Sequence, residues 1–208
     1  MRTARAPHLS RWDRFFQSTP AAQAVRNRKA YFQELVRSMA AARGRLDVLN
    51  VASGPGRDVR EYLEAHRSAR VRFDCIDKDA AALAYARELC AAFKHRVRFI
   101  RGNALSFRAE TRYDLVWSAG LFDYFDDRVF RRVLPRLLAA VAPGGQLVVG
   151  NFSDANPNRA YMHLLEWDLH HRSPDHLLAL AGQCGIAAHR LRIGQESQGI
   201  NLFLHVAG

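Results

Sequence analysis

The stretch VLNVASGPGRDV, residues 48–59, passes from an apolar run into a turn of small residues and then into a helical pattern. Gly54 and Gly56 allow a ligand to approach the backbone closely, and Pro55 stiffens the turn between them. In an open parallel sheet, ligands bind where a strand ends in such a turn. Ordinary tight turns have the same composition, so the rest of the chain must distinguish the two interpretations.

The length and composition predict one domain with a substantial core, since the chain has 208 residues and is 49% hydrophobic. The opening residues MRTARAPHLSRW lack the apolar segment of a secretory signal. Nor does any apolar stretch approach the roughly 20 residues that cross a membrane. We therefore expect a cytoplasmic protein without a membrane partner. The three cysteines match no metal-binding spacing, so no metal is expected.

The net charge of +11 raises the question of a nucleic-acid partner. The positive residues are nearly all arginines, however, and they are scattered through every predicted element. A compositional bias towards arginine and alanine produces the same total. A small anionic substrate is at least as compatible with this charge, and we do not expect nucleic acid to be the partner.

Strand and helix patterns alternate from residue 46 to residue 152. The predicted strands are residues 46–52, 71–77, 96–103, 113–120 and 146–152, and the predicted helices are residues 57–66, 79–93 and 127–141. Such alternation indicates an α/β fold with parallel strands joined by right-handed crossovers. Pro135 is expected to kink the third helix or to start a new one.

The two ends of the chain follow other patterns. Residues 1–44 are predicted to form a helical lid segment that ends near Gly44, and residues 45–208 the single main domain. After residue 152, helices are expected over 160–172 and 173–185, followed by a hairpin of two strands, 189–195 and 200–208.

Asp77 ends the second predicted strand, where a carboxylate can accept both hydroxyls of a ribose. A P-loop requires Lys-Ser/Thr after its last glycine, whereas Arg57 and Asp58 stand here. The dinucleotide fingerprint requires a glycine near Val59. The pattern therefore favours an adenosyl ligand without a pyrophosphate.

The chain resembles the class I S-adenosylmethionine-dependent methyltransferases from about residue 46 to its end. The resemblance rests on NVASGPG (50–56), Asp77, GNAL (102–105), WSAGLFDYF (117–125) and LAAVAPGGQLVV (138–149). It implies a three-layer αβα Rossmann-like sheet of seven strands, with the last strand antiparallel and N-terminal helices as a lid. It also implies S-adenosyl-L-methionine as the cofactor. The cofactor-binding residues are then Arg28, Asn50, Ala52, Ser53, Gly54, Gly56, Asp58, Asp77, Lys78, Asn103, Ala104, Leu105, Ser118, Ala119 and Gly120.

Three positions depart from that family's pattern. Asn50 replaces the usual acid, Ala52 replaces the first glycine, and Asn103 replaces an aspartate that often meets the adenine. An asparagine carbonyl can still accept the adenine hydrogen bond. Neutral Asn50 weakens the electrostatic hold on the methionine ammonium group, and Asp58 is the candidate that compensates.

A narrower resemblance links NVASGPGRDVREYL, GLFDYF and residues 148–173 to the bacterial synthases of 3-hydroxypalmitic acid methyl ester. Members of that group methylate a fatty-acid carboxylate. Related groups also contain enzymes of secondary metabolism with aromatic or amino-acid-like substrates, so the resemblance does not fix the acceptor.

The acceptor determines whether a base is needed. A carboxylate is already ionised at pH 7, whereas a phenol or an ammonium group must lose a proton. His163, Trp167 and His170 are expected to share one face of the 160–172 helix. The candidate catalytic residues are Asp123, Tyr124, His163 and His170, and the candidate substrate-binding residues are Phe122, Asn151, Tyr161 and Trp167.

These observations predict a methyltransferase that acts on a small molecule, through O-methylation of a carboxylate or phenol-type acceptor in lipid-signal or specialised metabolism. Three alternatives stay open: an N-methyltransferase of a small amine or amino-acid-like metabolite, an RNA or DNA methyltransferase, and a non-catalytic adenosyl-ligand-binding subunit. The exposed N-terminal helices are also candidates for a homodimer contact.

Overall fold

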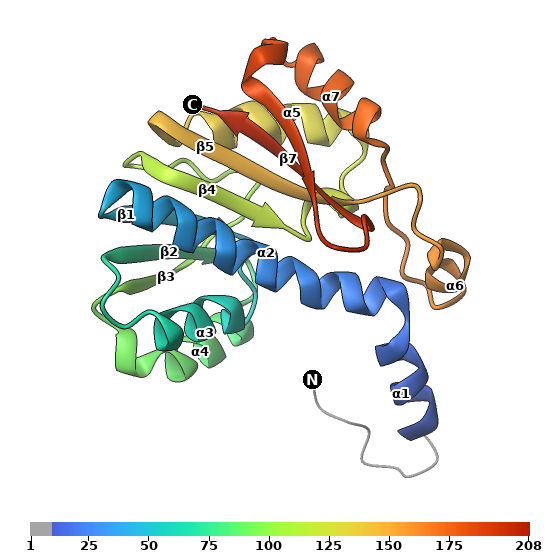
Figure 1. Ribbon diagram of the computed structural model, residues 1–208, viewed down its shortest axis with the longest axis horizontal. Coiled ribbons are helices and arrows are strands. Elements are labelled where there is room, and N and C mark those ends of the chain that lie inside the picture. Colours follow the sequence, from blue (N-terminus) through green and yellow to red (C-terminus); the bar gives the residue numbers. More distant parts are fainter. Residues whose placement is uncertain (1–9) are drawn as a thin grey trace.

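The structure is a computed structural model and describes residues 10–208. A seven-stranded sheet of order β3-β2-β1-β4-β5-β7-β6 runs through it (Figure 1). The strands are β1 (Leu46–Val51), β2 (Val71–Asp77), β3 (Val97–Arg101), β4 (Tyr113–Ala119), β5 (Val141–Phe152), β6 (Leu191–Gln195) and β7 (Asn201–Ala207). Strands β1 to β5 pair in parallel, and β7 is antiparallel to both of its neighbours. The predicted seven-stranded Rossmann-like fold is confirmed.

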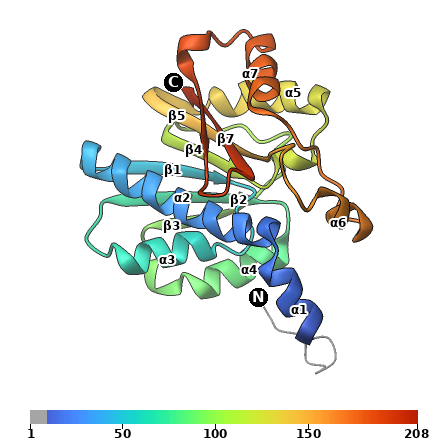
Figure 2. The ribbon, with the colours of Figure 1, turned by 45° about the vertical axis from the view of Figure 1, so that its right-hand side comes forward.

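Helices cover both faces of the sheet, as Figure 2 shows. The helices are α1 (Ser10–Ser18), α2 (Pro20–Arg43), α3 (Arg57–Ala65), α4 (Ala80–Leu89), α5 (Asp127–Leu138), α6 (Arg159–Leu164) and α7 (Pro174–Gln183), with short 3₁₀ turns η2 (Ala91–Phe93), η3 (Phe122–Tyr124) and η4 (Ala188–Arg190). Helices α2 and α3 share one buried cluster with β1, whereas α5 and α7 share another with β4 and β5. Central strands buried on both faces are apolar nearly throughout, as in β4 and β5.

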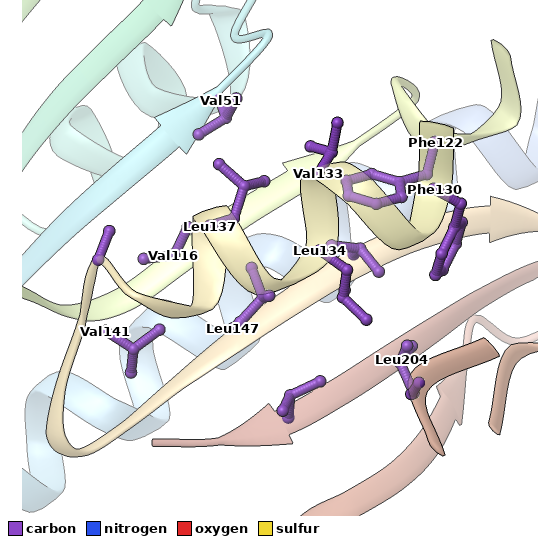
Figure 3. Packing of buried hydrophobic residues seen from close by; sticks show 14 of the residues in the cluster. Val51, Val116, Phe122, Phe130, Val133, Leu134, Leu137, Val141, Leu147 and Leu204 are labelled. Atoms are coloured by element: carbon purple, nitrogen blue, oxygen red, sulfur yellow. The ribbon is translucent and has the colours of Figure 1, made fainter. Parts of the chain in front are cut away.

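The cluster under α5 and α7 is the larger part of the core (Figure 3). Phe122 and Phe130 pack edge to face with their ring centroids 4.9 Å apart, and both are fully buried. Edge-to-face pairs of this kind contribute roughly 0.5–1.5 kcal/mol beyond the area that they bury. This packing fixes η3, which follows β4 directly and lies beside the carboxyl ends of the strands.

Local sequence signals account for the helix ends. The Asp79 carboxylate accepts hydrogen bonds from the backbone N–H groups of Ala81 and Ala82, and the Ser173 hydroxyl accepts one from His176. Both are N-caps of the expected kind. Gly44 ends α2 in the left-handed conformation at φ 73°. These predicted ends are confirmed.

Pro135 lies inside α5, so of the two expected outcomes it does not start a new helix. The Arg131 carbonyl that it cannot bond accepts a hydrogen bond from Cys184 Sγ at 3.6 Å. One helix prediction is wrong: the helix expected over 160–172 ends at Leu164, because the chain turns at Glu166 with φ 56°. His163, Trp167 and His170 therefore do not share a helix face.

Candidate active site

A cavity of about 370 Å³ lies at the carboxyl ends of β1 and β4, under helix α2. This volume is within the range of small-molecule and cofactor sites. The lining comprises Asn50, the turn 52–58, Trp117, Ala119 and Gly120 from the sheet, and Val25, Arg28, Lys29 and Phe32 from α2. The cavity therefore lies at the ends of β1 and β4, and the sequence predicts ligand binding at the end of β1.

The glycine-rich turn is shaped by left-handed backbone at three positions. Ala52, Gly54 and Gly56 have φ values of 57°, 56° and 65°. A β-carbon on Gly56 would lie 3.4 Å from both the Ala86 β-carbon and the Phe99 ring, so glycine fits the close packing there. A β-carbon on Gly54 would meet nothing within 4 Å. Gly54 therefore leaves its side of the turn open to a ligand.

Asp77 ties this turn to the end of β2. Its carboxylate accepts hydrogen bonds from the backbone N–H of Gly54 at 2.7 Å and from that of Asp79 at 2.9 Å. Each carboxylate oxygen can accept a second hydrogen bond. Asp77 therefore sets the shape of the turn and retains acceptor capacity for a ligand hydroxyl.

Arg28 brings a positive charge from α2 into the cavity. Within residues 10–208 its guanidinium has no hydrogen bond and no carboxylate within 4 Å. Burial lowers the pKa of Arg28, and the more distant charges of Asp123 and Asp58 partly oppose that shift. A half-buried guanidinium without a direct partner is suited to bind a carboxylate supplied by a ligand.

Two further buried polar groups face the cavity. Ser53 Oγ makes no hydrogen bond within residues 10–208, and the Asn50 amide faces the Asp58 carboxylate, whose charged form it favours. Unsatisfied buried polar groups are costly, so they indicate a site completed by a ligand. Together with the open side of Gly54 and the unpaired Arg28, these atoms fit the amino-acid end and the ribose of S-adenosyl-L-methionine.

Two carboxylates lie near the Arg28 charge. Burial raises the pKa of Asp58, although the Val59 N–H and Arg28 favour its charged form. Burial also raises the pKa of Asp123 to about 6, against the opposing effects of the Phe152 N–H, Arg28 and Arg172. The Phe152 N–H donates to the Asp123 carboxylate at 2.5 Å. Asp123 is thus an acid whose protonation changes near neutral pH.

Several predicted cofactor residues lie outside the cavity wall. Lys78 and Leu105 are exposed, Asn103 Oδ1 accepts the Leu105 N–H at 3.0 Å within its own turn, and Ala104 packs against the core. Ser118 is fully buried and donates its hydroxyl to the Val51 carbonyl at 3.1 Å. Ser118 therefore joins β4 to β1 and does not line the cavity.

The residues predicted to act on or bind the methyl acceptor lie partly at the surface and partly in the interior. Tyr124 is exposed and accepts a hydrogen bond from Trp167 Nε1 at 3.1 Å, while Tyr161 packs edge to face on Phe15. His163 is exposed and pairs with Asp168, whereas the exposed His170 donates its backbone N–H to the Asp123 carbonyl. None of these residues lines the cavity under α2, and His163 and Trp167 line a separate hollow beside α6.

Phe122 and Asn151 belong instead to the interior. Asn151 donates to the carbonyls of Phe152 and His170 and accepts from Arg172. Arg172 is 1% exposed and also donates to Asp127 and to the carbonyls of Phe122 and Phe125. Sequence reasoning missed Arg172, because an arginine after a helical pattern is normally solvated.

Comparison with known proteins adds to this geometry. Residues 48–145 match the family model described as a methyltransferase domain. The matched segment contains the glycine-rich turn, Asp77 and η3. No curated protein sequence matches the chain.

Several solved structures share the fold of this chain. A possible exported protein from Bordetella parapertussis has a TM-score of 0.76 at 22% identity, covering 98% of this chain and 73% of its own. A putative O-methyltransferase from Nostoc punctiforme has a TM-score of 0.71 at 16% identity, covering 99% and 62%. DhpI in complex with SAH has a TM-score of 0.63 at 20% identity, covering 91% and 88%.

The chain thus spans less than two thirds of the Nostoc protein. Residues 48–145 match a methyltransferase domain, and DhpI, which shares the fold, was solved with SAH bound. Among residues 10–208, none of the helices has the length and apolar character needed to traverse a membrane.

Proposed function

We propose that this protein is an S-adenosylmethionine-dependent methyltransferase that O-methylates a small carboxylate or phenol-type acceptor. The observation that carries the proposal is the unpaired Arg28 guanidinium in the cavity beside the glycine-rich turn. In this proposal Arg28 binds the carboxylate of the cofactor's methionine, Asp77 binds the ribose, and Asn50 and Ser53 complete the amino-acid end.

The cofactor supplies the methyl group and the leaving group, so the chain's own residues must position the acceptor. In this proposal the hydrogen-bonded pair Tyr124 and Trp167 receives an acceptor with an apolar or aromatic body. Leu164 and Leu165, which precede Trp167 in the chain, are exposed to 76% and 49%. The similarity in fold to a putative O-methyltransferase agrees with an oxygen acceptor.

The two acceptor classes differ in their need for a base. A phenol needs a proton acceptor within reach of its hydroxyl, whereas a carboxylate needs none. Asp123 is 1% exposed, does not line the cavity and accepts the Phe152 N–H, so in this proposal it supports η3 and does not take a proton from the acceptor.

Calorimetry with S-adenosylhomocysteine, followed by a labelled-methyl screen over acids, phenols and amines, tests the proposal. Arg28→Gln should weaken S-adenosylhomocysteine binding at least tenfold. Arg37→Gln, an exposed arginine of the same helix paired with Glu34, is the matched control and should leave binding unchanged. Binding without turnover of any acceptor would favour a non-catalytic subunit, and turnover restricted to amines would replace O-methylation by N-methylation.

A further inference from the structure

A second hollow, of about 520 Å³, lies at the amino ends of β1, β2, β3 and β4, away from the methyltransferase cavity. The connection from β3 to β4, residues 102–112, contains no helix, although parallel crossovers usually carry one. In β2 the polar residues Arg72 and Asp74 alternate with the buried Val71, Phe73 and Cys75, as expected for a strand that has no helix over one of its faces. This part of the sheet therefore presents polar side chains on one face.

The hollow carries a strong excess of positive charge. Six arginine and lysine side chains line it against two carboxylates, Asp47 and Asp74. Arg45 pairs with Asp47 at 2.8 Å, and Arg98 pairs with Asp74 at 2.7 Å. Tyr113 donates its hydroxyl to Asp74 as well, at 2.6 Å. Both carboxylates of the hollow are thus already neutralised.

The remaining cations have no carboxylate partner within residues 10–208. Arg72 and Lys94 make neither an ion pair nor a side-chain hydrogen bond there, and Arg112 contacts only the Val141 carbonyl, at 3.3 Å. Arg96 donates to the carbonyls of Val71 and Arg67, yet its Nη2 is buried without a partner. Three cations without a carboxylate partner and an unsatisfied guanidinium nitrogen therefore line the hollow, and an anion that enters it would supply the missing acceptors.

We propose that this hollow is a binding site for a small, multiply charged anion of the phosphate class. Its volume suits a metabolite-sized ligand. Its aromatic residues, Phe73 and Tyr113, are 1% and 5% exposed, so they offer no platform on which the bases of a single strand could stack. Guanidinium groups match phosphate oxygens in geometry, and arginines dominate the lining.

The site is independent of methyl transfer. The hollow and the methyltransferase cavity share no lining residue, and they stand at opposite ends of β1 and β4. The proposal therefore holds whether or not the proposed acceptor is correct.

Calorimetry with inorganic tripolyphosphate, at saturating S-adenosylhomocysteine, tests the site. Wild-type protein should show saturable binding, and the double variant Arg72→Gln/Lys94→Gln should bind at least tenfold more weakly. The control Arg128→Gln/Arg132→Gln removes the same charge from exposed positions of α5 and should change the affinity less than twofold. Thermal unfolding midpoints of both variants establish that they fold, and Lys94→Gln alone should give an intermediate affinity.

Three results would overturn the proposal. Equal weakening in the two double variants would assign the binding to the overall field of the protein. Absence of saturable binding would exclude the site. A short RNA oligomer that binds more tightly than tripolyphosphate, and loses that affinity in Arg72→Gln/Lys94→Gln, would make the hollow part of a nucleic-acid surface.

Discussion

Arg28 and Gly120 are in direct contact: Nη1 of Arg28 lies 2.7 Å from the position that a β-carbon on Gly120 would occupy. Gly120 follows β4 directly and has a φ of 90°, where other residues are strained. Because Gly120 has no side chain, the Arg28 guanidinium of α2 can lie against the end of β4. This contact connects α2 with the cavity at the carboxyl ends of β1 and β4.

Gly120→Ala should displace the Arg28 guanidinium and weaken S-adenosylhomocysteine binding roughly tenfold, which is about 1.4 kcal/mol. Calorimetry measures the loss. Gly182→Ala is the control, because a β-carbon there would meet nothing within 4 Å. An unchanged affinity in Gly120→Ala would show that Arg28 does not hold the ligand.

Asp77→Ala should weaken S-adenosylhomocysteine binding by roughly 10- to 100-fold, because it removes both the support of Gly54 and the acceptor for ribose hydroxyls. Asp79→Asn is the matched control two residues later, since asparagine also caps α4. Full affinity in Asp77→Ala would exclude the ribose role.

The sheet was predictable because its signals are local. Apolar runs, caps such as Asp79 and Ser173, and the turn at Gly54 each arise within a few residues. The 160–172 segment was not, because its helical spacing of apolar residues is overridden at Glu166, where the backbone enters the left-handed region. Tertiary contacts such as the bond from Trp167 to Tyr124 then place the following residues.

The site was predictable only in part. The turn and Asp77 follow from strand order, whereas Lys29 and Phe32 enter the cavity through the packing of α2 on the sheet. Sequence spacing carries no information on that long-range contact. The same limit explains Asn151, a polar residue near the end of β5 that resembles a substrate ligand in sequence but bonds to Arg172 in the interior.

Arg172→Met should lower the free energy of unfolding by about 3–5 kcal/mol, because it leaves Asn151 and the carbonyls of Phe122 and Phe125 without their donor. Urea denaturation measures the change. Arg131→Met, at an exposed arginine bonded to Gln183, should change stability by less than about 0.5 kcal/mol. A loss below about 1 kcal/mol in Arg172→Met would mean that the loops around η3 are held by apolar packing alone.

Asp123 gives a pH dependence of defined sign. Its pKa is about 6 in the folded protein, above the ordinary aspartate value of 3.8. Between those values the folded state therefore binds more protons than the unfolded state, and stability falls as pH rises through this window. The shift corresponds to about 3 kcal/mol at neutral pH.

Asp123→Asn retains an acceptor for the Phe152 N–H but cannot ionise. The variant should be more stable than wild-type protein by up to about 3 kcal/mol at pH 7.5, and the difference should shrink towards pH 4. Urea unfolding of both proteins across this range measures the difference, in which the contributions of all other titrating groups cancel. A difference that does not vary with pH would show that Asp123 ionises in the folded protein as easily as in water, because Arg28 and Arg172 then compensate fully for its burial.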